Sequence, residues 1–278
     1  MSHESTAVVL GGGGLAGIGW TIGVLAALEE YGVLRLDSVD HVIGTSAGAA
    51  VAAAALQTGS AGVEYDKAVR KTRRNDELAP AVALADVIPD VMAIHGSEDS
   101  AAVKTERLMR LSRERSGVDP SRRRAAIARR VEKDCWPGGR LDITAVRADG
   151  GRTVFTSESG VGLVDALTAS CAVPGLWPVA HIDGEDYIDG GTFSLTNAEL
   201  ARDADHVIVL QPMAELPAYA TAERQQVLNR AVVIHPSERA RAGFGSDPFD
   251  PDVRGVAAVL GYEDGLAAAL AVTSLIGK

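Results

Sequence analysis

Residues 41–48 constrain the fold of this chain more than any other segment. They begin as an apolar run typical of a buried strand, continue into a G-x-S-x-G turn centred on Ser46, and lead into the Ala-rich residues 49–56, which favour helix. A Cβ at Gly44 or Gly48 would collide with neighbouring backbone in such a tight turn. The sequence therefore predicts a strand–turn–helix unit that presents Ser46 either as a nucleophile or as an ordinary N-capping serine.

Apolar, β-branched runs alternate with helical segments along the rest of the chain. The runs predicted as strands are residues 6–10, 41–44, 141–147, 152–156, 181–182, 187–188, 206–210 and 231–235. Helices are expected at about residues 18–31, at 164–172 and over most of 253–276. Strands that are joined through helices favour parallel pairing, so the pattern predicts an α/β fold with a mainly parallel sheet.

Residues 62–134 are helix-prone and carry no strand signal, which predicts a helical insertion. The insertion would cover one end of the sheet, either as a lid at a substrate entrance or as a layer that only packs. No linker rich in Pro, Ser or Gly divides the 278 residues. We therefore expect one domain over residues 1–278.

The net charge of −10 is unevenly distributed. Residues 104–134 contain eleven Lys or Arg and five Asp or Glu, so this window carries +6 and the rest of the chain −16. Such a basic segment is either a solvated helical face or a surface attracted to anionic lipid head groups, which would give peripheral contact with a membrane. Nucleic acid is not expected as a partner, because the segment has no interleaved aromatic residues and the whole chain is acidic.

The cysteines and the apolar runs indicate a compartment. Cys135 and Cys171 are too few for a disulfide framework, and neither has a metal-like Cys or His nearby in the sequence, so we expect no metal site. Residues 1–10 lack the pattern of a signal peptide. The apolar runs 47–56 and 266–276 are shorter than the roughly 20 residues of a membrane span. These features predict a cytoplasmic protein whose contact with lipid is peripheral.

The glycine loop after the first strand has two possible uses. Backbone amides of Gly12, Gly13 and Gly14 lie between a strand and a helix, where they could bind an oxyanion. Gly12, Gly14 and Gly17 also satisfy the G-x-G-x-x-G fingerprint of a dinucleotide site, with Asp37 twenty residues further on. The residues by themselves leave both uses open, and the loop could also be a plain tight turn.

A nucleophilic serine needs a base, and the sequence offers two kinds. His181, His206 and His235 all follow Ser46, and the last two also follow Asp189, which matches the Ser, Asp, His order of a hydrolase triad. His206 begins a predicted strand and His235 ends one, and neither has a surrounding motif, so each could instead be a structural histidine. Asp189 ends a predicted strand and precedes two glycines, so its carboxylate could reach a neighbouring site, and burial would raise its pKa toward that of a general base. It could equally be a turn aspartate.

Three motifs in this order resemble the patatin-like phospholipase family. They are Gly12-Gly13-Gly14-Leu15-Ala16-Gly17, Gly44-Thr45-Ser46-Ala47-Gly48 and Asp189-Gly190-Gly191. Residues 23–32 are similar to the first helix of that family, and residues 169–175 to the segment before its aspartate. The likeness runs from about residue 7 to residue 197, with poor coverage of the helical insertion.

The resemblance implies a three-layer α/β/α fold and a Ser-Asp dyad that hydrolyses lipid acyl esters without a catalytic histidine, a metal or another cofactor. On this basis Ser46 would attack the acyl carbonyl, Asp189 would activate Ser46, and amides of Gly12, Gly13 and Gly14 would form the oxyanion hole. The substrate would be a phospholipid or a related acyl ester.

This chain departs from the family pattern in two places. Ala16 stands where the family commonly has Arg or Lys, and the stretch to Gly23 is one residue longer than usual. The family pattern therefore does not assign which of the glycine amides face the oxyanion. Two other functions stay open: an oxidoreductase that binds a dinucleotide at Gly12, Gly14 and Gly17, and a non-catalytic lipid-binding protein with the same fold.

Overall fold

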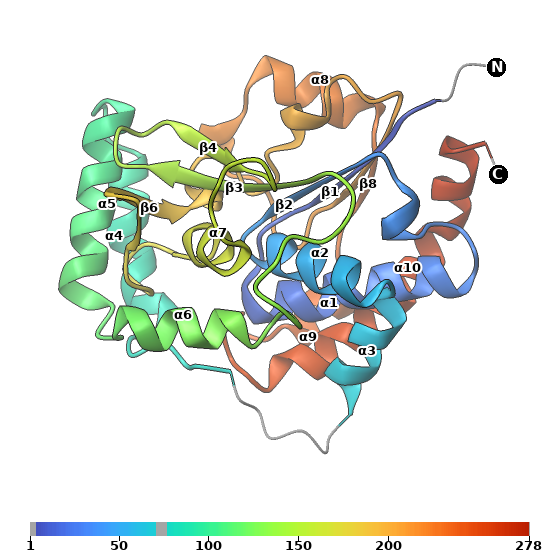
Figure 1. The fold of residues 1–278 in the computed structure, drawn as a ribbon, viewed down its shortest axis with the longest axis horizontal. Coiled ribbons are helices and arrows are strands. Elements are labelled where there is room, and N and C mark those ends of the chain that lie inside the picture. Colours follow the sequence, from blue (N-terminus) through green and yellow to red (C-terminus); the bar gives the residue numbers. More distant parts are fainter. Residues whose placement is uncertain (1–3, 71–76, 278) are drawn as a thin grey trace.

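The computed structural model describes residues 4–70 and 77–277. One eight-stranded sheet has the order β5-β6-β3-β2-β1-β7-β8, and β4 pairs with β3 outside this path (Figure 1). The strands are β1 (Thr6–Leu10), β2 (His41–Thr45), β3 (Leu141–Arg147), β4 (Arg152–Phe155), β5 (Ala180–Ile182), β6 (Glu185–Asp189), β7 (His206–Leu210) and β8 (Val232–Ile234).

Five neighbouring strands of the sheet, in the order β3-β2-β1-β7-β8, are parallel to one another. Strands β4, β5 and β6 pair antiparallel. The mainly parallel sheet predicted from the sequence is confirmed. Each predicted strand is present, with ends that differ by no more than about one residue in most cases. The parallel strands end at one edge of the sheet, so the glycine loop after β1 and the turn after β2 lie next to each other.

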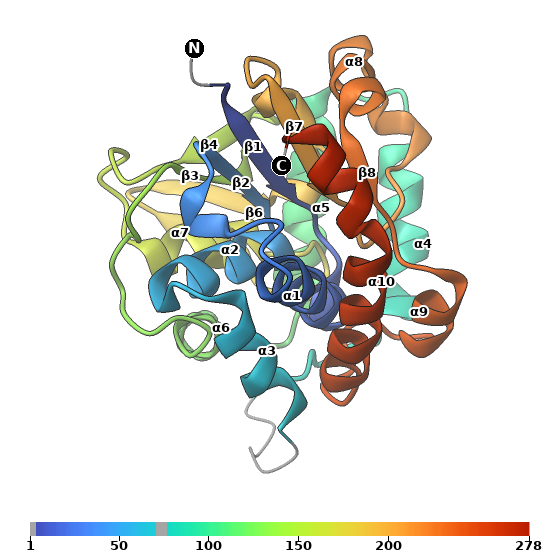
Figure 2. The same ribbon diagram turned by 90° about the vertical axis from the view of Figure 1, so that its right-hand side faces the viewer.

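Helices cover both faces of the sheet. The α-helices are α1 (Gly14–Glu30), α2 (Ala47–Thr58), α3 (Ala61–Val69), α4 (Leu84–His95), α5 (Ala101–Arg115), α6 (Pro120–Ala128), α7 (Leu163–Ser170), α8 (Ala222–Arg230), α9 (Glu238–Gly243) and α10 (Val253–Leu275). Short 3-10 turns are η1 (Leu36–Ser38), η2 (Gly190–Thr192), η3 (Ala198–Ala201) and η4 (Pro217–Tyr219). The largest apolar core lies between the sheet and α1, α2, α7 and α10, while α8 and η3 cover the opposite face (Figure 2). This is the three-layer α/β/α arrangement.

Helix α1 begins at Gly14, four residues before the predicted start. The sequence suggested a later start because glycine disfavours helix. Here α1 and α10 cross so closely that glycine is required at the contact: a Cβ on Gly23 would lie 2.1 Å from Ala258 O, and one on Gly261 would lie 2.1 Å from Trp20 O. Packing between the two helices overrides the low helix propensity.

The C-terminal helix α10 confirms the helix predicted over most of residues 253–276, and it is longer than the apolar run 266–276 that was compared with a membrane span. Its 23 residues are long and apolar enough to cross a membrane by length and composition, although it packs on α1, and 33% of its most apolar window is buried. The run 266–276 is shorter than a membrane span because it includes uninterrupted apolar residues only, whereas α10 also includes the residues before that run. The exposed side of α10 carries Val256, Val259 and Leu270.

The insertion is helical, as predicted, and forms α3 to α6 without a strand in its described residues, 62–70 and 77–134. Helix α3 packs on α1 and α10, whereas α4 and α5 pack on β3 and β6 through a cluster that includes Leu108, Val146 and Ile188. Helices α4 and α5 therefore cover the antiparallel side of the sheet, whereas α3 belongs to the layer of α1 and α10. A gating role for it stays a prediction.

Many cations of the basic segment are paired with acidic groups. Arg113 pairs with Asp186 at 2.6 Å, and Arg124 with Asp165 at 2.6 Å, so two of these partners lie outside the segment itself. Contacts of this kind reduce the positive charge that the segment presents to solvent. The packing favours a solvated, ion-paired face over a dedicated anionic-surface patch.

Candidate active site

Ser46 lies between β2 and α2 in a strained backbone conformation. Its φ of 52° and ψ of −114° are unusual for a residue with a Cβ. A Cβ on Gly44 would lie 2.5 Å from Ala49 Cα, and a Cβ on Gly48 would lie 2.0 Å from Leu10 O. The steric reason inferred for both glycines is therefore confirmed, and the turn has the geometry of a nucleophile elbow.

The backbone of Ser46 is fixed by two residues at the C-terminal end of α7. Its N–H donates to Ser170 Oγ at 2.9 Å, and Cys171 Sγ donates to its carbonyl oxygen at 3.3 Å. Although Ser46 occupies the N-cap position of α2, its side chain makes no capping hydrogen bond. The N-capping interpretation is therefore wrong, and the hydroxyl is left available for another role.

Asp189 ends β6 and is buried, with 4% of its surface exposed. Its Oδ1 accepts a hydrogen bond from Gly191 N–H at 2.7 Å. Burial raises the pKa of Asp189 to about 7, even though hydrogen bonding with the Ser46 hydroxyl and the Gly191 N–H opposes that rise. Oδ2 has no well-aligned hydrogen bond within residues 4–70 and 77–277. The structure thus brings Asp189 to Ser46 as a carboxyl group that titrates near neutral pH.

A buried asparagine ties together the segments that carry these two residues. Asn197 has a φ of 54°, which asparagine tolerates better than most residues. Its Nδ2 lies 3.1 Å from Thr45 Oγ1, 3.2 Å from Thr144 Oγ1 and 2.7 Å from Ser194 O. The two threonine hydroxyls are also 2.9 Å apart. Sequence reasoning missed this network, since only its place at the end of the family likeness set Asn197 apart.

The glycine loop next to Ser46 has one occupied amide and two available ones. Gly12 N–H donates to Leu195 O at 2.9 Å. Gly13 N–H and Gly14 N–H make no hydrogen bond to the part of the chain that the structure describes. Gly14 has a φ of 63° and opens α1, so its amide lies at the positive end of a 17-residue helix. The loop can therefore offer amides to an anion beside Ser46.

The dinucleotide alternative finds no support in the position of Asp37. Asp37 lies in η1, which precedes β2, whereas the glycine loop follows β1. Because β1 and β2 are parallel, these two segments lie at opposite ends of the strands. Asp37 instead pairs with Arg35 at 2.8 Å. A dinucleotide site needs the acidic residue at the same end as the glycines.

The histidines proposed as alternative bases lie elsewhere. His181 is exposed on β5 and contacts Asp186 at 2.8 Å, and His206 begins β7, where it contacts Glu4 at 3.1 Å. His235 follows β8 and is exposed. None of the three lines the described part of the cavity at Ser46. In the described residues, no group of three or more His, Cys, Asp or Glu could hold a metal ion.

A small cavity of about 20 Å³ lies against Ser46. Gly14, Leu78, Arg123, Trp177 and Phe249 are among the residues that line it. This volume holds about one water molecule. An acyl chain therefore needs the apolar side chains of this wall to move aside, and the site is closed in this conformation.

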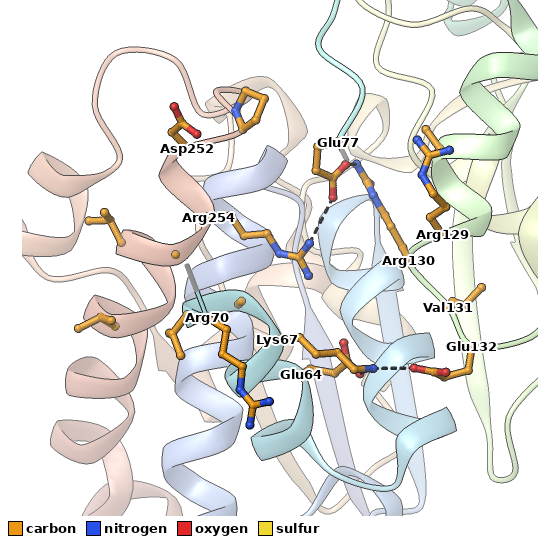
Figure 3. Close-up of a pocket in the computed structure, with 17 residues that line it drawn as sticks. Glu64, Lys67, Arg70, Glu77, Arg129, Arg130, Val131, Glu132, Asp252 and Arg254 are labelled. Atoms are coloured by element: carbon orange, nitrogen blue, oxygen red, sulfur yellow. Dashed lines mark hydrogen bonds and ion pairs between the residues drawn. The ribbon is translucent and has the colours of Figure 1, made fainter. Parts of the chain in front are cut away.

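Figure 3 shows a larger cavity of about 790 Å³. Arg130 lines both this cavity and the cavity at Ser46. Ion pairs run along its wall: Arg254 lies 3.3 Å from Glu77, and Lys67 lies 2.6 Å from Glu132. None of the described residues that line it is Ser, Thr, Cys or His. Of these two cavities, the one at Ser46 has a candidate nucleophile among its described residues.

An α/β/α sandwich with a serine on a strand–turn–helix elbow defines a hydrolase-like class of protein. The chain belongs to the patatin-like phospholipase family, whose model matches residues 8–202. The glycine loop, Ser46 and Asp189 all lie within the matched range.

Solved structures with a similar outline include two bacterial proteins. VipD from Legionella pneumophila aligns over 97% of this chain and 67% of its own, with 12% identity and a TM-score of 0.49. The type III effector protein ExoU is 18% identical and aligns over 97% of this chain and 53% of its own, with a TM-score of 0.41. A structure of ExoU with SpcU from Pseudomonas aeruginosa gives 18% identity, coverages of 96% and 52%, and a TM-score of 0.38. The chain thus spans about half to two thirds of their lengths. No curated protein matches the chain.

Proposed function

We propose that this protein is a serine hydrolase that cleaves fatty-acyl esters of phospholipids or related lipids through a dyad of Ser46 and Asp189. The observation that carries the proposal is the strained Ser46 at the elbow beside a buried carboxyl group whose pKa is raised. Perturbed titratable groups next to a candidate nucleophile are typical of catalytic sites.

In the first half of the reaction, Ser46 Oγ attacks the acyl carbonyl carbon while its proton passes to Asp189. The carbonyl oxygen becomes an oxyanion, and the available amides of Gly13 and Gly14 are suited to bind it, since the Gly12 amide is already engaged by Leu195 O. The tetrahedral intermediate then collapses. Its bond to the alcohol breaks, and Asp189 returns the proton to the leaving alcohol oxygen.

In the second half, water attacks the acyl-enzyme formed on Ser46. Asp189 accepts a proton from the water, the same amides stabilise the second oxyanion, and Ser46 leaves as a hydroxyl when Asp189 returns the proton. The fatty acid is released and the enzyme is regenerated. A carboxyl group with a pKa of about 7 can carry out both transfers near neutral pH, because it can hold and release a proton there.

Two features argue against a fold retained for binding alone. A strained backbone and a buried carboxyl group both cost stability, and they persist most readily where function requires them. A non-catalytic lipid-binding protein would have no need for either feature at the same point. The oxidoreductase alternative would leave Ser46 and Asp189 without a role.

The test is turnover of a soluble chromogenic acyl ester by the purified protein and by Ser46→Ala. We expect Ser46→Ala to lose at least about a thousandfold in kcat. Ser38→Ala is a matched control, because Ser38 is an exposed serine whose hydroxyl only donates to Arg35 O. Full activity in Ser46→Ala would contradict the proposal.

A further inference from the structure

Arg123 is a buried cation within the cavity at Ser46. It comes from α6, in the helical insertion, and is 3% exposed. Its guanidinium carbon lies 3.7 Å from the centre of the Trp177 ring, and Nη2 donates to Cys171 O at 3.3 Å. Nε and Nη1 are buried and have no hydrogen-bond partner within residues 4–70 and 77–277. Two donor nitrogens of a fixed guanidinium are therefore left without a partner in the described residues.

Within residues 4–70 and 77–277, no carboxylate forms an ion pair with Arg123. The neighbouring Arg130 pairs with Glu77 at 2.8 Å, and Glu77 also contacts Arg254 at 3.3 Å. Burial and the nearby Arg130 lower the pKa of Arg123 to about 9, which leaves it charged at neutral pH. Asp189 is the other acidic group near Arg123, and its own pKa is raised to about 7.

A buried guanidinium with free donors is costly unless an anion meets it. Guanidinium donors match the oxygens of a phosphate better than those of an uncharged group, and Trp177 holds the plane of the guanidinium in place. Arg123 and Ser46 line the same small cavity, so an anion at Arg123 and an ester at Ser46 would belong to one molecule.

We propose that Arg123 binds a phosphate group carried by the substrate close to the scissile ester, and so makes the enzyme select phosphate-bearing acyl esters over neutral glycerides. This proposal rests on the proposed hydrolase function, and it assigns the choice of substrate to a residue of the helical insertion. Arg123 acts here as a binding residue. It takes no part in the proton transfers between Ser46 and Asp189.

The test compares two soluble esters that differ only in the phosphate: dihexanoyl phosphatidate and dihexanoylglycerol. We expect Arg123→Met to lower the ratio of kcat/KM for the anionic ester to that for the neutral ester by at least about tenfold. Arg123→Lys keeps the charge and should retain most of the ratio. Arg122→Met is the matched control, because Arg122 is an exposed arginine on the same helix, and its ratio should stay at the wild-type value.

Equal losses on both esters in Arg123→Met would overturn the proposal, since they would indicate a structural role. A wild-type enzyme without preference for the phosphate, or a ratio that falls equally in Arg122→Met, would also overturn it. Circular dichroism checks that each variant is folded. If Arg123→Met does not fold, Arg123→Lys still decides the test.

Binding to catalytically disabled protein separates this proposal from the hydrolase function. Ser46→Ala should bind dihexanoyl phosphatidate at least about tenfold more tightly than Ser46→Ala combined with Arg123→Met, as measured by calorimetry. Inorganic phosphate should bind far more weakly than the phosphatidate. Equally tight, Arg123-dependent binding of inorganic phosphate would identify a free-anion site and refute a substrate contact. Absence of Ser46-dependent turnover would refute the hydrolase function, while this binding comparison still decides the role of Arg123.

Discussion

Thr45 and Asp189 pair with consecutive residues of β3: Thr45 lies opposite Thr144, and Asp189 lies opposite Ala145. Strand β2 runs parallel to β3, whereas β6 runs antiparallel to it. Strands β2 and β6, which flank β3, therefore end at the same level of β3. Ser46 follows directly after Thr45, the last residue of β2. The approach of the candidate nucleophile to its candidate base is a consequence of sheet register.

Asn197 should affect catalysis without contact with substrate. Asn197→Ala removes the amide that joins the segments of Thr45, Thr144 and Ser194, and leaves buried oxygens without that donor. We expect a loss of about 2 kcal/mol in the free energy of unfolding and a fall in kcat of about 10- to 100-fold. Urea unfolding and kinetics on a soluble ester measure the two effects.

The matched control for this variant is Asn229→Ala. Asn229 is exposed on α8, where its side chain accepts a hydrogen bond from Gln225. Both quantities should stay near the wild-type values in the control. A stable Asn197→Ala protein with normal kcat would show that the network does not position the site.

Gly48→Ala tests the steric account of the elbow. The added Cβ would lie 2.0 Å from Leu10 O, which is backbone of the central strand and cannot move aside cheaply. We expect a loss of at least about 3 kcal/mol in the free energy of unfolding, or failure to fold. Gly138→Ala is the control, because its Cβ would meet nothing within 4 Å. Equal stability of the two variants would refute the account.

The raised pKa of Asp189 predicts a pH-dependent cost in stability. Its pKa is about 7 in the folded protein and about 3.9 in an unfolded chain. Below pH 4 both states hold the proton. As the pH rises toward 7, only the unfolded state releases it, so the free energy of unfolding of the wild type falls.

Asp189→Asn carries no such titration. Its free energy of unfolding should therefore increase relative to the wild type by about 4 kcal/mol between pH 4 and pH 8. Urea unfolding of both proteins across this range measures the difference, and other titrating groups cancel in the comparison. A difference that does not change with pH would mean that Asp189 has an ordinary pKa in the folded protein.

Single replacement of His181, His206 or His235 by Gln should leave kcat within about threefold of the wild type. The reason is their position: none of them lines the described part of the cavity at Ser46. Kinetics of the three variants on a soluble ester provide the measurement. A loss of about ten-thousandfold in one of them would point to a triad with a histidine base.

The local parts of the site could be predicted from the sequence. The collisions that require Gly44 and Gly48 arise within the strand–turn–helix unit and a neighbouring strand, so residue spacing was enough to infer them. Strand positions followed in the same way from short apolar runs. The proposed pairing of Ser46 with Asp189 joins distant segments, and its prediction depended on the family likeness.

Other features depend on contacts that no local pattern encodes. The amide of Gly12 is not available to an oxyanion because it donates a hydrogen bond to Leu195 O, a residue distant in the sequence. Arg123 is one of eleven cations in a basic segment, and only the packing of α6 buries it against Trp177 while Arg122 and Arg124 on the same helix stay exposed. Spacing cannot identify which cation of a solvated helix turns inward.

The most direct test of the central claim is the rate at which a fatty-acyl fluorophosphonate labels Ser46, followed by mass spectrometry in the wild type, Ser46→Ala and Asp189→Asn. We expect a single adduct on Ser46 in the wild type, none in Ser46→Ala, and labelling at least about a thousandfold slower in Asp189→Asn. Labelling of Asp189→Asn at the wild-type rate, or an adduct on a residue other than Ser46, would contradict the dyad.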